Sequence, residues 1–169
     1  TCVATQEDTE AFGPMLAAEA RERGFQQASR KAFIADGAAN NWTVQQRHFP
    51  DYVPIVDFVH LVSYVYAVAM VAGTNADARW NLYVRWIHMI WQGDNQQVDD
   101  EWRYLARQHE IPDQALKETD ARRPLQRGLT YLENNLTRID YPRYRRLGLP
   151  VTSTLVESLI KEFNYRIKG

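Results

Sequence analysis

The sequence predicts an α/β fold in which short strands alternate with helices and a long helical block follows. Two short apolar runs, Lys31–Asp36 and Tyr52–Asp57, have the length and residue types of buried strands. Apolar residues elsewhere recur at the three- and four-residue steps of amphipathic helices. Strands that alternate with helices are typical of an α/β layer with a partly parallel sheet.

The first expected helix covers Thr5–Arg23, because Phe12 and Leu16 lie one turn apart on one face and Gly24 stands where a helix ends. The run Lys31–Asp36 then ends in Asp-Gly, which is typical of a strand followed by a turn.

A short helix is expected next, from Asn40 or Asn41 to His48, with an asparagine as its cap. In the second run, Tyr52–Asp57, Pro54 favours an edge position or a strand that begins at Ile55. Two strands do not make a stable sheet alone, so further strands are expected before Thr1.

From Phe58 the chain is expected to be helical for about eighty residues, followed by a proline-bounded loop at Asp140–Pro150. A final helix is expected from Thr152 or Ser153 to about Ile167. The helices of the long block are expected at Phe58–Val71, Ala76–Gln92, Val98–Glu110 and Gln114–Leu136.

Charge is unevenly distributed, although the net charge is only −1. The segment from Asp94 to Asp120 has eight acids and three bases, and the segment from Arg138 to Gly169 has seven bases and three acids. The basic end faces phosphates or is simply a solvated surface. The only cysteine, Cys2, excludes an internal disulfide and a cysteine-based zinc site. The polar start predicts that there is no signal peptide, and the broken apolar stretch near 55–72 predicts no membrane span. With a single cysteine, an intracellular protein is the simplest interpretation.

Carboxylates stand where metal-dependent chemistry would need them. Asp36 and Asp57 each close a strand, His60 follows three residues after Asp57, and Glu157 lies in the last helix. Magnesium prefers oxygen ligands, and two-metal phosphodiester chemistry needs carboxylates that converge from separate elements. Asp36 and Glu157 would meet that need.

Each of these residues also has an ordinary structural explanation. Asp36-Gly37 is a common turn, and Asp57 would cap a helix. His60 on an apolar helix is more often a core residue than a ligand, and Glu157 would pair with Lys161 one turn later.

Two ordered blocks resemble a known family, the bacterial insertion-sequence transposases of the DDE type that are related to Mutator-like elements. Phe33–Met70 resembles the second-aspartate region, and Tyr141–Gly169 resembles the third-carboxylate region. The first block carries Asp36-Gly37-Ala38, Trp42, His48-Phe49-Pro50 and the Asp-x-x-His motif Asp57 to His60; the second carries Arg143 to Arg146, Gly148-Leu149-Pro150, Thr152-Ser153-Thr154, Val156-Glu157 and Arg166 to Lys168.

The resemblance implies a partial ribonuclease H-like core at residues 1–75, a large all-helical insertion at 76–137, and a basic loop and final helix at 138–169. It implies that Asp36 and Glu157 are catalytic and bind Mg²⁺ or Mn²⁺. Asp57 and His60 belong to the family's Asp-x-x-His motif, which would either position DNA or support the metal site. The implied reaction is hydrolysis at a transposon end, then attack of the freed 3′-hydroxyl on target DNA.

The implied partners are DNA and further copies of the chain, in the bacterial cytoplasm near the nucleoid. Contacts to DNA are expected to be mainly to phosphates, with an affinity that falls steeply with salt. The cations proposed for this role are Arg143, Arg145, Arg146, Arg166 and Lys168.

One departure from the family limits what this chain is expected to do. The first catalytic aspartate of the family lies on a strand before the first helix, and none of Glu7, Asp8 and Glu10 matches it. We therefore expect an incomplete domain with little activity alone. Two alternatives stay open: a non-catalytic transposase-derived module that binds DNA or protein, and a plain helical interaction domain that uses a tryptophan-rich face (Trp80, Trp86, Trp91).

Overall fold

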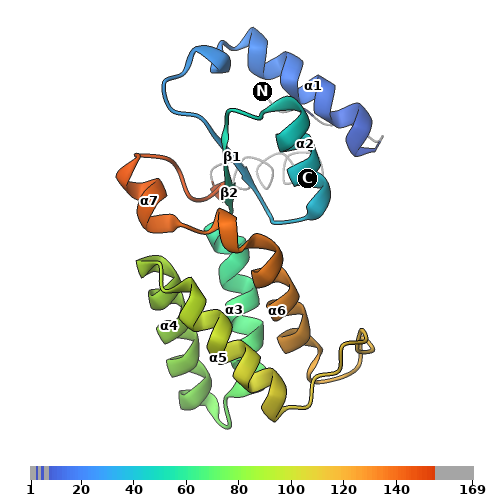
Figure 1. The fold of residues 1–169 in the computed structure, drawn as a ribbon, viewed down its shortest axis with the longest axis vertical. Coiled ribbons are helices and arrows are strands. Elements are labelled where there is room, and N and C mark those ends of the chain that lie inside the picture. Colours follow the sequence, from blue (N-terminus) through green and yellow to red (C-terminus); the bar gives the residue numbers. More distant parts are fainter. Residues whose placement is uncertain (1–2, 4, 6–7, 155–169) are drawn as a thin grey trace, which may run out of the picture. The chain divides into compact units, whose positions relative to one another are not determined.

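The fold is mixed and mostly helical, with one small parallel sheet of two strands in the part that the computed structural model describes, residues 3, 5 and 8–154. This confirms the predicted combination of helices and parallel strands. The chain divides into two compact units (Figure 1). We call them the strand-bearing unit, Thr1–Asp57 with Tyr144–Gly169, and the helical unit, Phe58–Arg143.

The first helix, α1 (Thr9–Glu22), begins later than the sequence predicted. The Asp8 carboxylate accepts the backbone N–H groups of Glu10 and Ala11 at 3.0 and 3.1 Å, so Asp8 caps the helix. A start at Thr5 was therefore wrong, because Thr5 and Asp8 themselves are not helical. Gly24 ends the helical path with φ +70°, as expected, and a short 3₁₀ turn follows at Phe25–Gln27.

A strand, a helix and a second strand then form one parallel βαβ segment: β1 (Ala32–Ala35), α2 (Ala39–His48) and β2 (Val53–Val56). The strands pair in parallel, with Ala32 opposite Val53 and Ala35 opposite Val56. Pro54 is accommodated inside β2, which has only one partner strand among the described residues and is therefore an edge strand.

Aromatic side chains fill the space between these elements. Phe33 of β1 lies 5.4 Å from Phe49, and Phe49 lies 5.1 Å from Tyr52, measured between ring centroids. The buried Gln45 side chain donates to the backbone carbonyls of Phe49 and Tyr52 at 2.9 and 3.1 Å. These bonds hold the turn from α2 into β2 and so fix where β2 begins.

The helical unit contains four longer helices that lie alongside one another (Figure 1). None of the described helices combines the length and the apolar character needed to cross a membrane. The four helices are α3 (Phe58–Ala72), α4 (Ala76–Gln92), α5 (Asn95–Gln108) and α6 (Arg123–Asn135).

The core of the helical unit depends on a close crossing of α3 and α6. A Cβ atom added at Gly128 would lie 2.4 Å from Cγ2 of Val68 and 3.2 Å from the Trp102 ring. Trp102 in turn packs edge-on against Trp86, and both indoles are fully buried. The absence of a side chain at Gly128 therefore lets the two helices approach, and the tryptophans fill the space beside them.

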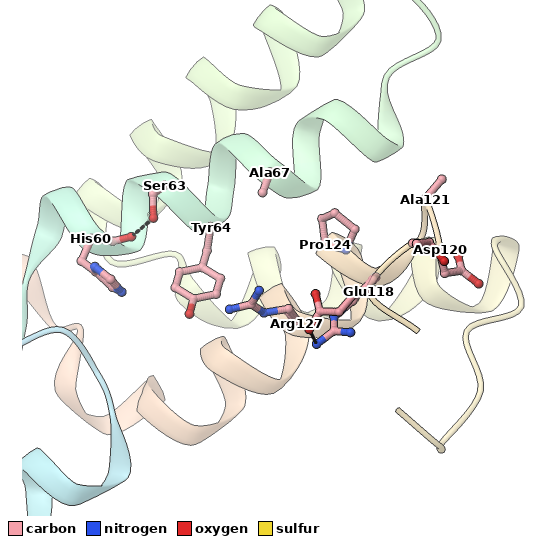
Figure 2. A pocket seen from close by; sticks show the side chains of 11 residues that line it. His60, Ser63, Tyr64, Ala67, Glu118, Asp120, Ala121, Pro124 and Arg127 are labelled. Carbon is pink, nitrogen blue, oxygen red and sulfur yellow. Dashed lines mark hydrogen bonds and ion pairs between the residues drawn. The ribbon is translucent and has the colours of Figure 1, made fainter. Parts of the chain in front are cut away.

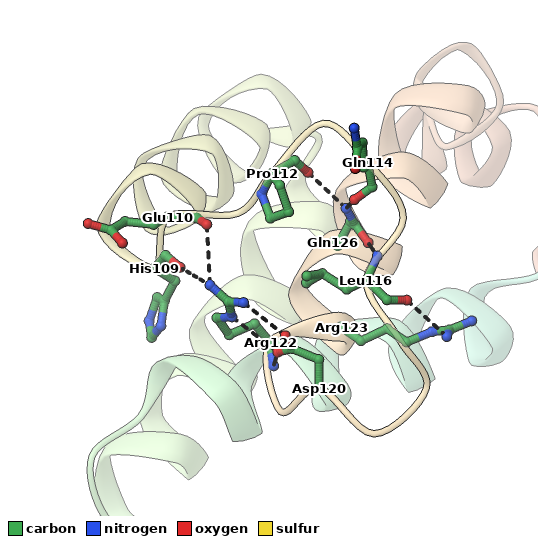
Figure 3. A network of polar contacts seen from close by, with 9 residues as sticks. All are labelled: His109, Glu110, Pro112, Gln114, Leu116, Asp120, Arg122, Arg123 and Gln126. Atoms are coloured by element: carbon green, nitrogen blue, oxygen red, sulfur yellow. Dashed lines mark hydrogen bonds and ion pairs between the residues drawn. The ribbon is translucent and has the colours of Figure 1, made fainter.

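The segment before α6 is a loop, so the predicted helix at Gln114–Leu136 began too early. Side chains at the start of α6 satisfy the loop carbonyls instead (Figure 3). Gln126 donates to Pro112 and Gln114 at 2.9 and 2.8 Å, and Arg122 donates to His109 and Glu110 at 3.2 and 3.3 Å. These bonds replace the helical ones that the periodicity alone predicted.

Residues 140–150 were also predicted wrongly, because most of the expected loop is a helix, α7 (Tyr141–Arg146). The Asp140 carboxylate accepts the Arg143 N–H at 3.1 Å, and Pro142 stands in the first turn, where its missing N–H costs nothing. Asp followed by Pro two residues later was a helix-start signal that we had assigned to a loop. A short 3₁₀ turn, Leu136–Arg138, precedes it.

Candidate functional site

Two aspartates lie at neighbouring positions at the carboxyl edge of the sheet. Ala35 and Val56 end β1 and β2 as register partners, and Asp36 and Asp57 are the next residues on the two chains. The backbone N–H of Asp57 donates to the Ala35 carbonyl at 2.8 Å, so the parallel pairing continues to this point. The carboxyl ends of parallel strands are where α/β sheets usually carry their sites.

The Asp36 carboxylate is exposed but held in one orientation. Its Oδ1 accepts the Ala38 N–H at 2.9 Å and the side-chain amide of Asn41 at 2.8 Å. The backbone at Gly37 has φ +92°, which a side chain would disfavour. The turn after β1 and the first turn of α2 therefore fix an ionisable oxygen pair at the sheet edge.

The Asp57 carboxylate is in a different environment, with only 3% of the residue exposed. Its Oδ2 accepts two bonds from Ser153, at 2.6 Å from the backbone N–H and 2.5 Å from Oγ. Thr152 Oγ1 lies 3.4 Å from both carboxylate oxygens. Asp57 therefore joins the end of β2 to a segment ninety-six residues later in the chain.

Two further bonds attach the returning segment, residues 144–154, one to β2 and one to the residues just before β1. The Tyr144 hydroxyl donates to the Pro54 carbonyl at 3.5 Å, and Arg30 donates to the Gly148 carbonyl at 3.2 Å. Gly148 has φ +64°, and a Cβ there would meet the Arg30 guanidinium at 2.2 Å. The last described residue, Thr154, is helical, and Glu157 lies outside the described residues.

His60, the other half of the Asp-x-x-His motif, lies on α3 in the helical unit. It is half-buried, and its ring centroid lies 5.6 Å from that of Tyr64 and 6.0 Å from that of Tyr131. Tyr64 and Tyr131 are stacked, with centroids 3.9 Å apart. His60 also lines a pocket, which Figure 2 shows from close by.

The predicted DNA-binding arginines fall into two groups. Arg143, Arg145 and Arg146 are exposed on α7, whose buried side chains are Tyr141 and Tyr144. The other two cations, Arg166 and Lys168, lie outside the described residues. Exposed guanidinium groups on one short helix can contact phosphates, and their exposure means that salt will screen them.

Sequence reasoning missed three residues that hold the site together. Asn41 was interpreted as a helix cap, but the helix N-cap is Ala38, without a side-chain bond, and Asn41 bonds Asp36 instead. Ser153 was interpreted only as a cap, although it is the main partner of Asp57. Arg30 carried no signal, because its bond to the Gly148 carbonyl spans 118 residues.

The fit of these residues to a divalent cation differs between the two aspartates. Asp36 offers an exposed, oriented carboxylate, which suits a hard cation. Asp57 is buried and accepts strong donors at one oxygen, which suits an anchor rather than a ligand. Within the described ranges, no group of three or more His, Cys, Asp or Glu side chains could hold a metal ion.

Comparison with known protein families, with curated proteins and with solved structures finds no match for this chain.

Proposed function

We propose that this chain is part of a metal-dependent DNA-cutting and DNA-joining domain of the DDE transposase type, with a partial ribonuclease H-like core. The observation that carries the proposal is the carboxyl edge of the sheet. Asp36 and Asp57 follow paired parallel strands there, and Asp57 binds the segment that leads to Glu157.

Chain length supports a role for Glu157 near Asp36. Ser153 is bonded to Asp57, which is the residue next to the pairing position of Ala35 on the other strand. Residue 157 follows Ser153 by four positions, and an extended chain advances roughly 3.6 Å per residue, so the two are at most about 14 Å apart. A tether of this length allows a second carboxylate to reach the sheet edge.

Asp36 and Glu157 are the residues that would hold Mg²⁺ or Mn²⁺, with Asp57 as their support. A bound ion of this kind activates the attacking oxygen and stabilises the leaving oxygen in phosphodiester transfer. The contribution of the chain is to orient: Ala38 and Asn41 fix the Asp36 carboxylate, so little reorganisation is needed when a ligand arrives.

The arginines of α7 would bind the DNA backbone. Arg143, Arg145 and Arg146 are exposed on one short helix, and we expect them to contact mainly phosphates, which would make binding insensitive to sequence. Duplex affinity is then expected to fall with salt, with a slope that becomes shallower by about 0.9 for each arginine that is removed.

The test of the proposal is a Mn²⁺ titration of the isolated chain, followed by paramagnetic broadening of its amide NMR signals. We expect selective broadening at residues 36–38 and 152–154, lost in Asp36→Asn and in Glu157→Gln. Asp51→Asn is the matched control, because Asp51 precedes β2 at the opposite end of the strand. Diffuse broadening that all three variants share equally would overturn the proposal.

A second candidate function, protein binding by the helical unit, is favoured by one specific observation. Trp80 is 61% exposed and Tyr66 50% exposed, and both rings contact Tyr83. Apolar aromatic groups gathered on a surface often mark an interface. Oligomeric or partner binding that is lost in Trp80→Ser, with the Mn²⁺ response absent, would favour this function over the first.

A further inference from the structure

The helical unit contains a pocket of about 560 Å³ between α3, α6 and the loop before α6 (Figure 2). This volume lies within the range of small-ligand sites. The pocket combines two aromatic rings from α3, His60 and Tyr64, with two arginines of α6, Arg123 and Arg127. Of its lining residues only His60 belongs to the Asp-x-x-His motif, and neither Asp36 nor Asp57 lines the pocket.

The charges around the pocket leave one cation available. Arg123 is ion-paired with Glu118, and Asp120 is ion-paired with Arg122, whose hydrogen bond lowers the pKa of Asp120 to about 2. Arg127 is exposed and has no ion pair or hydrogen bond within the described residues. A ligand with a single negative charge would therefore match the pocket.

The aromatic wall offers a flat surface. One face of Tyr64 is stacked on Tyr131, with ring planes only 13° apart. Tyr131 does not line the pocket, so the opposite face of Tyr64 is the one turned toward it. Figure 2 shows Tyr64 and Arg127 projecting into the same space from α3 and α6. Tyr64 and Arg127 together would therefore bind a ligand that carries a planar ring next to a phosphate.

We infer that this pocket binds one nucleotide of an unpaired DNA strand, with the base stacked on Tyr64 and its phosphodiester against Arg127. The phosphodiester carries one negative charge, which matches the guanidinium of Arg127, the pocket arginine that has no ion pair among the described residues. Base stacking on aromatic side chains tolerates any sequence, and arginine contacts with phosphate are common in single-strand binding. The inference rests on the proposed DNA chemistry, because strand cutting and joining creates unpaired ends that must be held.

The test measures binding of a fluorescently labelled single-stranded oligodeoxyadenylate to the full chain by anisotropy, across a salt series. Tyr64→Leu is expected to weaken binding roughly 5- to 150-fold, and Tyr64→Phe to bind like the wild type. Arg127→Gln is expected to weaken binding and to make the salt slope shallower by about 0.7. Because Arg127 is an exposed surface residue, this variant remains informative if Tyr64→Leu fails to fold.

The matched controls are Arg107→Gln and Tyr104→Leu. These residues form another exposed arginine–tyrosine pair on α5, with the guanidinium 6.0 Å from the ring centroid. We expect both to leave binding unchanged. Equal weakening by the control and pocket variants, or no weakening by the pocket variants, would overturn the inference.

Two further arms separate the alternatives. Deoxyadenosine monophosphate carries the same base, with a phosphomonoester in place of the phosphodiester. If it competes as strongly as the oligonucleotide does, the ligand is a free nucleotide and the inference of a bound strand is overturned. Asp36→Asn is expected to retain oligonucleotide binding. If Mn²⁺ causes no selective broadening but binding still depends on Arg127, the carboxylate proposal is wrong and the inference about the pocket is supported. If Mn²⁺ causes selective broadening but binding does not depend on Arg127, only the inference about the pocket is wrong.

Discussion

Replacing Asp57 tests whether the segment that leads to Glu157 is held by one buried carboxylate. Both strong bonds from Ser153 go to the same oxygen, Oδ2. Asp57→Asn can therefore keep both bonds by placing its amide oxygen there, whereas Asp57→Ala removes both. The two variants separate the charge of the carboxylate from its role as an acceptor.

The magnitudes follow from these contacts. A hydrogen bond to a charged group contributes about 1.5–3 kcal/mol, roughly twice a neutral bond. Ser153 is half-exposed, so water replaces part of what is lost. We expect Asp57→Asn to lower the free energy of unfolding by about 1–2 kcal/mol, and Asp57→Ala by about 2–4 kcal/mol.

The assay is urea unfolding combined with hydrogen exchange at the Ser153 amide. Exchange should be fastest in Asp57→Ala and intermediate in Asp57→Asn. Asp36→Asn is the matched control, because its two bonds also meet at one oxygen but the carboxylate is exposed. A loss below about 0.5 kcal/mol in Asp57→Ala, with Ser153 exchange unchanged, would refute the anchor, since surface substitutions have effects of that size.

Three further predictions concern packing, pH and backbone conformation. Gly128→Ala should destabilise the fold by about 1–2 kcal/mol in urea unfolding, because overpacking outweighs a helix-propensity gain of about 1 kcal/mol, and Val68→Ala should relieve the clash. The pKa of Asp120 is lowered to about 2 by Arg122, so their contact should be complete above about pH 4 and lost as pH falls through about 2, as a carboxyl NMR titration would show. Gly148→Ala should cost about 1–2 kcal/mol in a thermal melt, because φ is +64° there.

Elements with strong local sequence signals were predicted correctly. Predictions were wrong where hydrogen bonds from side chains distant in sequence determine the backbone conformation. The strands and α4 follow from apolar runs and periodicity alone, and α4 matches the predicted Ala76–Gln92 at both ends. The loop before α6 has enough helical periodicity to mislead, because its carbonyls are satisfied by Gln126 and Arg122 rather than along a helix. The helix at Tyr141–Arg146 was missed although its signal was local.

The candidate site also combines residues that the sequence predicted with contacts that only the structure reveals. Strand ends are readable from sequence, so Asp36 and Asp57 were found as carboxylates at the ends of strands. That they lie on adjacent parallel strands could be known only from the strand register in the structure. The hydrogen bonds between Asp57 and Ser153 join residues ninety-six positions apart, and no sequence pattern indicates them. The pocket beside His60 was missed because it combines α3 with a loop whose conformation was predicted wrongly.

The chain leaves the strand-bearing unit and returns to it at two points that are both close to β2. The chain leaves this unit after Asp57, the residue that follows β2, and returns to it at Tyr144. The Tyr144 hydroxyl donates a hydrogen bond to the Pro54 carbonyl of β2. Both ends of the helical segment are therefore connected to β2, one through the backbone at Asp57 and the other through the hydrogen bond of Tyr144. Joining two nearby points costs the sheet no rearrangement, and loop-closure entropy rises only slowly with the length inserted. The bonds of Asp57 to Ser153 and of Tyr144 to Pro54 thus hold the carboxyl edge of the sheet together across the helical segment between them.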